Sequence, residues 1–253
     1  MRSTGPYFKK SLQALVLMLA LFSFQSCKGQ NTESKQEGSD TTVYTYKPGS
    51  INGIGKWFMG REIAHVMGFQ GMQWLNRPER EQEENVSRLL KNMNIQADDV
   101  IADIGAGSGY HVFKMATQAP KGMVYGVDIQ EEMLAEMKRV QQKDGVTNVT
   151  LVKGSAQSVN LPENKVDKVL MVDVYHEFEF PLEMLASIKN AMKADAKLYL
   201  IEYRGEDPDI PIKTIHKMTE AQAVKELSAA GFTLVENIAN LPWQHCMVFQ
   251  KGN

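Results

Sequence analysis

The sequence predicts an α/β protein built on a doubly wound, mostly parallel sheet of seven strands, with an antiparallel last strand and an N-terminal helical extension. Apolar strand-like runs alternate with helical segments from Ala97 onwards, a pattern typical of parallel strands with helices on both faces. The run 100–103 ends in a glycine-rich turn that leads into a helical segment, which leaves bare backbone where a ligand can approach. Only residues 238–244 separate the last two strands. A connection without a helix permits only an antiparallel neighbour.

The first 26 residues are expected to be an export signal and not part of the fold. Three basic residues lie within 2–10, and the apolar run 12–24 that follows is short for a membrane span. A serine directly before Cys27 ends this run. The arrangement resembles the processing site of bacterial lipoproteins, which implies lipidation of Cys27 and an exported, membrane-anchored lipoprotein of a bacterial cell envelope. Ordinary cleavage nearby and a retained short anchor are the alternatives.

Residues 27–50 are polar and rich in Gly, Ser and Thr, and we expect a flexible tether there. Residues 51–94 form the helical extension, in which 57–68 is expected to be a short amphipathic helix. A second helix is expected from Pro78 to Met93, because proline suits a first helical turn and the acidic residues that follow suit the helix N-terminus. Its apolar residues recur at helical spacing, so one face should dock on the sheet.

The domain 95–253 carries the elements of the sheet in order. Strands are expected at 100–103, 123–128, 149–153, 167–173, 197–202, 233–237 and 245–250, and helices at 108–119, 130–142, 181–192 and 219–230. Ligands of such sheets bind beyond the carboxyl ends of the strands. That edge carries Asp103 with the glycine turn, and the segments 128–129, 154–156, 173–178 and 202–216.

The glycine turn indicates a nucleoside-binding site. Gly105, Gly107 and Gly109 follow Asp103 at alternate positions, and Asp128 ends the next strand, where an acid can bind a ribose diol. The spacing G-x-G-x-G differs from the dinucleotide pattern G-x-G-x-x-G. A carboxylate at Asp103 also suits a cationic ligand better than a pyrophosphate.

This pattern resembles the first two motifs of the class I S-adenosylmethionine-dependent methyltransferases. The resemblance covers about 95–253, includes the terminal antiparallel hairpin, and implies a Rossmann-like fold with S-adenosyl-L-methionine as cofactor. It implies cofactor contacts for Asp103, Gly105, Ala106, Gly107, Gly109, Tyr110, Asp128, Ile129, Ser155, Ala156 and Asp173. In the family an aspartate often binds the adenine amino group at the place of Ser155, so this chain departs from the pattern there. Asp173 is expected to touch the cofactor or a helix N-terminus.

The exit of strand 167–173 carries the candidate catalytic residues Tyr175, His176 and Glu177. The family geometry would turn them towards the cofactor's methyl group. His176 is the candidate general base because an imidazole titrates near neutral pH. Glu177 could orient His176 or pair with a cationic substrate, and Tyr175 could stack or donate a hydrogen bond. The alternative is that these three side chains only cap the strand and pack the loop.

Composition and residue spacing limit the kinds of partner and ligand that we expect. The chain has 28 Lys and Arg against 30 Asp and Glu, a formal net charge of −2, and no basic run, so nucleic acid is not an expected partner. His65, His111, His216 and His245 lack metal-ligand spacing, and no metal is expected. Oligomeric state cannot be read from the sequence.

The leading hypothesis is methyl transfer to a small-molecule acceptor, with a protein or lipid-like acceptor still open. Export would place the domain where little S-adenosylmethionine is expected. The alternative is therefore an exported, non-catalytic nucleoside-binding lipoprotein. A nicotinamide-dependent oxidoreductase is disfavoured by the glycine spacing and the terminal hairpin. The extension 51–94 would act as a lid over the cofactor, as in other family members, or as a solvated collar at a sheet edge.

Overall fold

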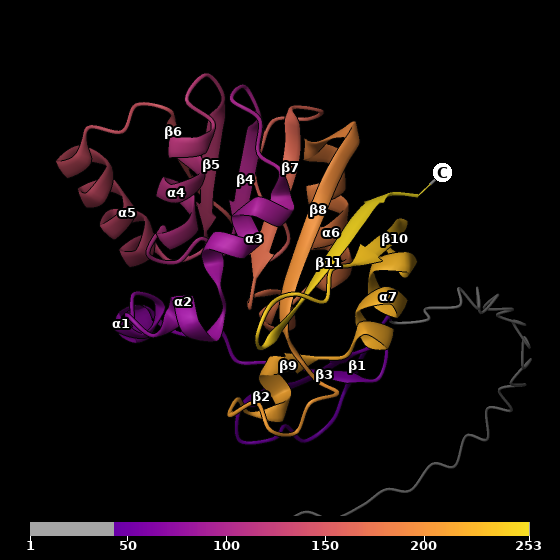
Figure 1. The fold of residues 1–253 in the computed structure, drawn as a ribbon. Coiled ribbons are helices and arrows are strands. Elements are labelled where there is room, and N and C mark those ends of the chain that lie inside the picture. The colour runs from indigo at the N-terminus through magenta and orange to yellow at the C-terminus, as the bar shows by residue number, and fades with distance from the viewer. Residues whose placement is uncertain (1–42, 253) are drawn as a thin grey trace, which may run out of the picture. The chain divides into compact units, whose positions relative to one another are not determined.

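A central sheet in the order β10-β11-β8-β7-β4-β5-β6 organises residues 43–252, the part of the chain that the computed structural model describes (Figure 1). Its strands are β4 (Val100–Ile104), β5 (Met123–Asp128), β6 (Val149–Lys153), β7 (Val166–Val172), β8 (Met192–Arg204), β10 (Phe232–Asn237) and β11 (Gln244–Lys251). Strand β11 runs antiparallel to both β8 and β10, whereas the pairs among β6, β5, β4, β7 and β8 are parallel. The short β9 (Lys217–Met218) adds to β8. The predicted fold class is confirmed.

Helices cover both faces of this sheet, as a doubly wound fold requires. On one face, α3 (Val86–Met93), α4 (Tyr110–Gln118) and α5 (Glu131–Asp144) bury side chains such as Leu89, Met115 and Met137 in one hydrophobic cluster. On the other face, α6 (Pro181–Ala191) and α7 (Glu220–Ala229) bury Leu185 and Leu227 in a second cluster. The sheet separates the two clusters and holds the ends of its strands in fixed positions.

The order of the strands sets the place of a ligand crevice. Strands β5 and β6 extend the sheet to one side of β4, while β7 and β8 extend it to the other. The strand order therefore reverses between the parallel strands β4 and β7, and the loops that leave their carboxyl ends diverge to opposite faces of the sheet. This switch point lies next to the glycine turn after β4.

The prediction of a helix over residues 57–68 is wrong. The chain forms a small antiparallel sheet there, of β1 (Tyr44–Tyr46), β2 (Gly53–Phe58) and β3 (Arg61–Ala64). Between β2 and β3, Met59 and Gly60 have φ values of 49° and 100°. Two residues with positive φ give the tight turn that matches the twist of a hairpin and ends any helix.

The helix predicted from Pro78 to Met93 is broken into two. Before it lie the 3₁₀ turn η1 (Phe69–Gly71) and α1 (Met72–Leu75), and the break separates α2 (Arg80–Glu83) from α3. Asn85 lies at the break with a φ of 53°, and its side chain accepts a hydrogen bond from the Arg88 N–H at 3.1 Å. Asn85 is therefore the N-cap of α3, which begins as a separate helix after the break.

The predicted export signal 1–26 and most of the predicted tether 27–50 lie outside the described residues. Within 43–252, no helix combines the length and apolarity needed to cross a bilayer.

Candidate functional site

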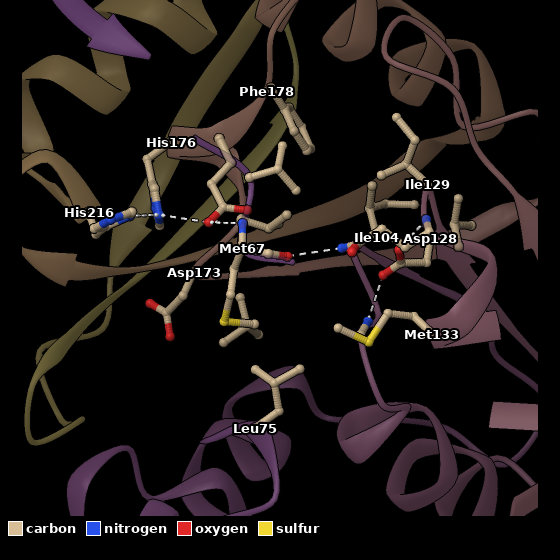
Figure 2. Close-up of a pocket in the computed structure, with 18 of the residues that line it drawn as sticks. Met67, Leu75, Ile104, Asp128, Ile129, Met133, Asp173, His176, Phe178 and His216 are labelled. Atoms are coloured by element: carbon tan, nitrogen blue, oxygen red, sulfur yellow. Dashed lines mark hydrogen bonds and ion pairs between the residues drawn. The ribbon is translucent and has the colours of Figure 1, made fainter. Parts of the chain in front are cut away.

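A cavity of about 650 Å³ opens at the switch point of the sheet (Figure 2). Its wall combines the loops after β4, β5, β6 and β7 with segments from the N-terminal extension and from the loop after β8. The residues from these segments include Val66, Met67, Trp74, Leu75, Gly105, Gly107, Asp128, Ile129, Ser155, Ala156, Asp173, His176, Glu177, Phe178, Lys213 and His216. Its volume lies in the range typical of small-molecule sites.

The glycine turn brings backbone to the cavity surface. Gly105 has a φ of 72°, and a Cβ added to it would lie 2.3 Å from the Val174 side chain. Gly107 has a φ of 54°, and its Cβ would lie 2.6 Å from Leu75. Both the left-handed backbone and the close packing exclude a side chain, so these positions need glycine.

Asp128, at the end of β5, holds this turn in place. One carboxylate oxygen accepts the Gly107 N–H at 2.8 Å, and the other accepts the Gln130 N–H at 2.8 Å before α5 begins. Burial raises the pKa of this carboxyl group, while the backbone N–H donors act in the opposite direction. The carboxylate lies in the cavity wall, as the sequence predicts.

The other predicted cofactor residues divide into two groups. Ile129, Ser155, Ala156 and Asp173 line the cavity together with Asp128 and the two glycines. Asp103, Ala106, Gly109 and Tyr110 are absent from the wall that the described residues form. Their predicted cofactor contacts therefore remain predictions.

Asp103 and Asp173 carry buried carboxylate oxygens without hydrogen-bond partners among residues 43–252. Burial raises the pKa of Asp103 to about 7 and the pKa of Asp173 well above its ordinary value. The second oxygen of Asp173 accepts a hydrogen bond from the Gln244 side chain at 2.6 Å. Asp173, which lines the cavity, is therefore a candidate contact for a polar or cationic ligand, whereas Asp103 lies outside the wall.

His176 lies at the cavity, oriented by a buried carboxylate. Its Nδ1 is 2.6 Å from Oε2 of Glu202, a fully buried residue at the end of β8. Because Nδ1–H donates to that carboxylate, Nε2 carries the lone pair and faces His216 Nδ1 at 3.1 Å and Glu177 at 3.8 Å. Figure 2 shows the two imidazoles side by side, on the opposite side of the cavity from Asp128.

The surroundings of this cluster raise the pKa values of His176 and Glu177 and lower the pKa of His216. Burial lowers the pKa of His176, but the Glu202 and Glu177 carboxylates outweigh it and leave that pKa raised. Burial lowers the pKa of His216 to about 4 and raises the pKa of Glu177 to about 7. Such divergent values are typical of functional sites.

Tyr175 does not join this cluster. Its ring is fully buried in the core, and its hydroxyl donates to Glu226 at 2.9 Å. Arg61 in turn binds Glu226 with two hydrogen bonds of 2.8 Å. The structure thus favours the packing interpretation for Tyr175, because β7 is followed by a 3₁₀ turn that points this side chain away from the cavity.

The N-terminal extension forms one wall of the cavity. The Met67 N–H donates to Glu177 at 3.1 Å, and the Phe69 N–H donates to the Gln130 side chain at 2.8 Å. From α1, Leu75 packs against Gly107 of the glycine turn, and Trp74 lines the cavity. Residues of the extension therefore contribute to the site, as the lid interpretation requires.

No pattern in the sequence assigns a role to His216 or Glu202. The sequence predicts that residues 202–216 lie at the ligand edge, but nothing in their spacing connects them to His176. The parallel register of β7 and β8 brings Glu202 to His176, and the pairing of β9 with β8 brings His216 back to the same edge. The acid that ends an apolar strand at Glu202 was the signal available in the sequence.

Comparisons with known proteins bear on this geometry. Residues 95–248 match the family described as a methyltransferase domain. The match covers more than half of the chain and contains the turn, the crevice and the cluster at His176.

The chain belongs to this methyltransferase-domain family.

Individual relatives agree with the family. An uncharacterised methyltransferase, YcgJ of Bacillus subtilis, is 24% identical over 173 residues, 67% of this chain and 66% of that protein. The tRNA U34 carboxymethyltransferase of Desulfotalea psychrophila is 27% identical over 171 residues, 63% of this chain and 53% of that protein. The chain thus spans about half to two thirds of the length of these curated relatives.

The solved structures show the same fold. A SAM-dependent methyltransferase from Aquifex aeolicus has a TM-score of 0.69 with 24% identity, and the match covers 74% of this chain and all of that one. Family membership confirms the methyltransferase domain that the glycine turn and strand-end acid indicated, and S-adenosyl-L-methionine is the cofactor that the family implies.

Proposed function

We propose that this domain transfers a methyl group from S-adenosyl-L-methionine to a small-molecule acceptor bound at the His176 side of the cavity. The observation that carries the proposal is the position of His176. Its Nε2 faces the same cavity as the glycine turn and Asp128, within hydrogen-bonding distance of His216, and Glu202 fixes the orientation of its ring.

The residues present fit the cofactor. Gly105 and Gly107 leave the backbone accessible, Asp128 offers a carboxylate at the strand end where a ribose diol binds, and Asp173 has an unpartnered buried oxygen in the wall. Ile129, Ser155 and Ala156 complete this side of the wall. When bound, the cofactor supplies an electrophilic methyl group on a sulfonium.

His176 would accept the proton of the acceptor's nucleophilic atom. A base oriented by a buried carboxylate is the arrangement used in many proton transfers, because the carboxylate fixes the tautomer and stabilises the imidazolium. The methionine, tryptophan and leucine side chains of the extension would exclude water from the acceptor. Glu177 lies close enough to pair with a cationic part of the acceptor.

Calorimetric titration with S-adenosylmethionine, S-adenosylhomocysteine and NAD tests the cofactor. Binding of the two adenosyl-sulfur compounds without binding of NAD is expected. His176→Ala should leave the affinity for S-adenosylmethionine within about twofold and lower the turnover of labelled methyl groups by roughly 100-fold. His65→Ala, which changes an exposed histidine outside the cavity, serves as the matched control. Absence of adenosyl-sulfur binding would favour the exported, non-catalytic module.

A small-molecule acceptor is favoured over nucleic acid by the charge of the chain. A formal net charge of −2 offers no general attraction for a polyanion. Relatives named as tRNA U34 carboxymethyltransferases make tRNA the partner to test against this proposal. A gel-shift titration with total tRNA at low salt, in which micromolar binding appeared, would contradict it.

Export and lipidation are part of the proposal and rest on the sequence of residues 1–27. Metabolic labelling with palmitate checks them, because Cys27→Ser should abolish the label and Cys246→Ser should not. Label retained in Cys27→Ser would contradict lipidation at this position.

A further inference from the structure

Two imidazoles and a carboxylate converge on one point of the cavity wall. Nε2 of His176, Nδ1 of His216 and a carboxylate oxygen of Glu177 all lie within 4.8 Å of one another. The two ring nitrogens are 3.1 Å apart. Two nitrogens bound to one Zn²⁺ at its usual bond length lie about 3–3.4 Å apart, so the spacing already matches a shared ion.

We propose that His176, Glu177 and His216 bind one divalent transition-metal ion of the Zn²⁺ type. Two neutral imidazoles and one carboxylate form a donor set that suits Zn²⁺, Fe²⁺ or Co²⁺, whereas Mg²⁺ and Ca²⁺ prefer oxygen donors alone. Three protein ligands leave a coordination position open towards the cavity, as in catalytic zinc sites.

The surroundings of the three ligands support this assignment independently. A metal-bound histidine usually donates its second ring N–H to a carboxylate, and Glu202 receives that hydrogen bond from His176 at 2.6 Å. Glu202 also accepts the backbone N–H of His176 at 3.2 Å. The Met67 N–H holds the Glu177 carboxylate at 3.1 Å. The Glu202 contacts orient His176, and the Met67 N–H orients the Glu177 carboxylate through Oε1, the oxygen that faces Nε2.

The charges around the cluster allow a cation. The two carboxylates of Glu177 and Glu202 face it, while the guanidinium of Arg61 is paired with Glu226. Lys213 lines the cavity nearby, but its ammonium donates to the Asn52 side chain at 3.0 Å.

A bound ion would determine which class of acceptor the site binds. This inference rests on the proposed methyl transfer. The open position would hold an oxygen or sulfur atom of a hydroxyl or thiol compound, which binds as an anion and releases its proton to solvent. With the ion in place, Nε2 of His176 is a ligand, and the ion replaces the ring as the group that makes the acceptor nucleophilic.

The test counts metal ions and needs no substrate. Protein purified without a histidine tag is stripped with a chelator and titrated with Co²⁺, followed by its visible absorption, and with Zn²⁺, followed by elemental analysis. One ion per chain is expected. His216→Ala and Glu177→Gln should each weaken binding at least tenfold, and Glu202→Gln should weaken it 10- to 100-fold by releasing the ring of His176. His65→Ala should bind like the wild type.

Two results would overturn the site: no ion bound by the wild type, or wild-type affinity in both His216→Ala and Glu177→Gln. Circular dichroism identifies a variant that fails to fold, and the other variant then decides. Titration of the stripped protein with S-adenosylmethionine separates the two proposals. Cofactor binding without metal binding leaves His176 as a proton acceptor, and metal binding without cofactor binding removes the methyl-transfer function but not the metal site.

Discussion

The acidic side chains at the two ends of the central strands have opposite surroundings. At the amino ends, Asp99 before β4 binds the Lys168 ammonium at 2.5 Å, and Asp167 of β7 binds Lys193 at 2.7 Å. At the carboxyl ends, Asp103 and Asp173 are buried with oxygens that have no partner among the described residues. The same strands thus carry paired acids at one edge and unpaired acids at the other.

This difference indicates that the two edges of the sheet have different roles. The paired acids at the amino ends join β4 to β7 and β7 to β8, and we expect them to contribute to stability alone. Unpartnered carboxylates at the carboxyl ends are costly in the free protein, because burial penalises their charge. Local destabilisation of this kind is common where a site is organised for a ligand, and the rest of the fold compensates for it. Changes at the carboxyl edge should therefore affect ligand binding as well as stability, whereas changes at the amino edge should affect stability alone.

The largest expected effect is on cofactor binding at the carboxyl edge. Asp128→Ala should weaken S-adenosylmethionine binding by about 1.5–3 kcal/mol, the cost of losing a charged hydrogen-bond partner to the ribose. Calorimetry measures the change, and Asp144→Ala, an exposed acid at the end of α5, is the control. Asp128→Asn keeps the shape that holds the Gly107 N–H and should give an intermediate loss. Equal affinities of wild type and Asp128→Ala would remove the ribose role.

A second effect concerns stability in the absence of ligand. The pKa of Asp103 is raised from 3.8 to about 7 by burial. Between these pH values the folded chain binds a proton that the unfolded chain has lost, so stability falls as pH rises from about 4 to 7. Asp103→Asn removes this penalty and should stabilise the protein by about 2 kcal/mol at pH 8, after the cost of burying an unpaired amide.

Urea unfolding at pH 4.5 and pH 8 measures this effect. The gain should be present at pH 8 and nearly absent at pH 4.5, where Asp103 is already protonated. The exposed neighbour Asp98 provides the control variant Asp98→Asn. An Asp103→Asn protein that is less stable than the wild type at pH 8 would show that the ionised carboxylate has a favourable partner.

The sequence predicted the edge that binds a ligand but not the contacts across it. Alternating periodicity and the glycine turn were enough for the parallel strands and crossover helices around β4, because local patterns determine strands and crossovers. The hairpin at Met59 and Gly60 was missed, since a mixed apolar and charged run fits either period and the positive φ values are not visible in the letters. Glu202 meets His176 through the register of β7 and β8, and His216 meets it because the chain returns after β8 to pair β9 with that strand. The core position of Tyr175 likewise depended on a 3₁₀ turn after β7.

The smallest expected effect is on the free energy of unfolding, at the amino ends of the strands. Lys193→Met keeps the apolar stem of the side chain but removes the ammonium of a partly exposed pair with Asp167, and it should lower the free energy of unfolding by about 1 kcal/mol at most. Lys168→Met should cost more, about 1–2 kcal/mol, because it leaves the buried Asp99 carboxylate with only the Gln96 N–H as a partner. Because neither lysine reaches the cavity, S-adenosylmethionine should bind both variants with wild-type affinity. Denaturant unfolding and calorimetry on the same samples check both statements. A loss of cofactor affinity in Lys168→Met would show that the two ends of β4 and β7 are coupled through the sheet, and the division between a stabilising edge and a ligand-binding edge would fail.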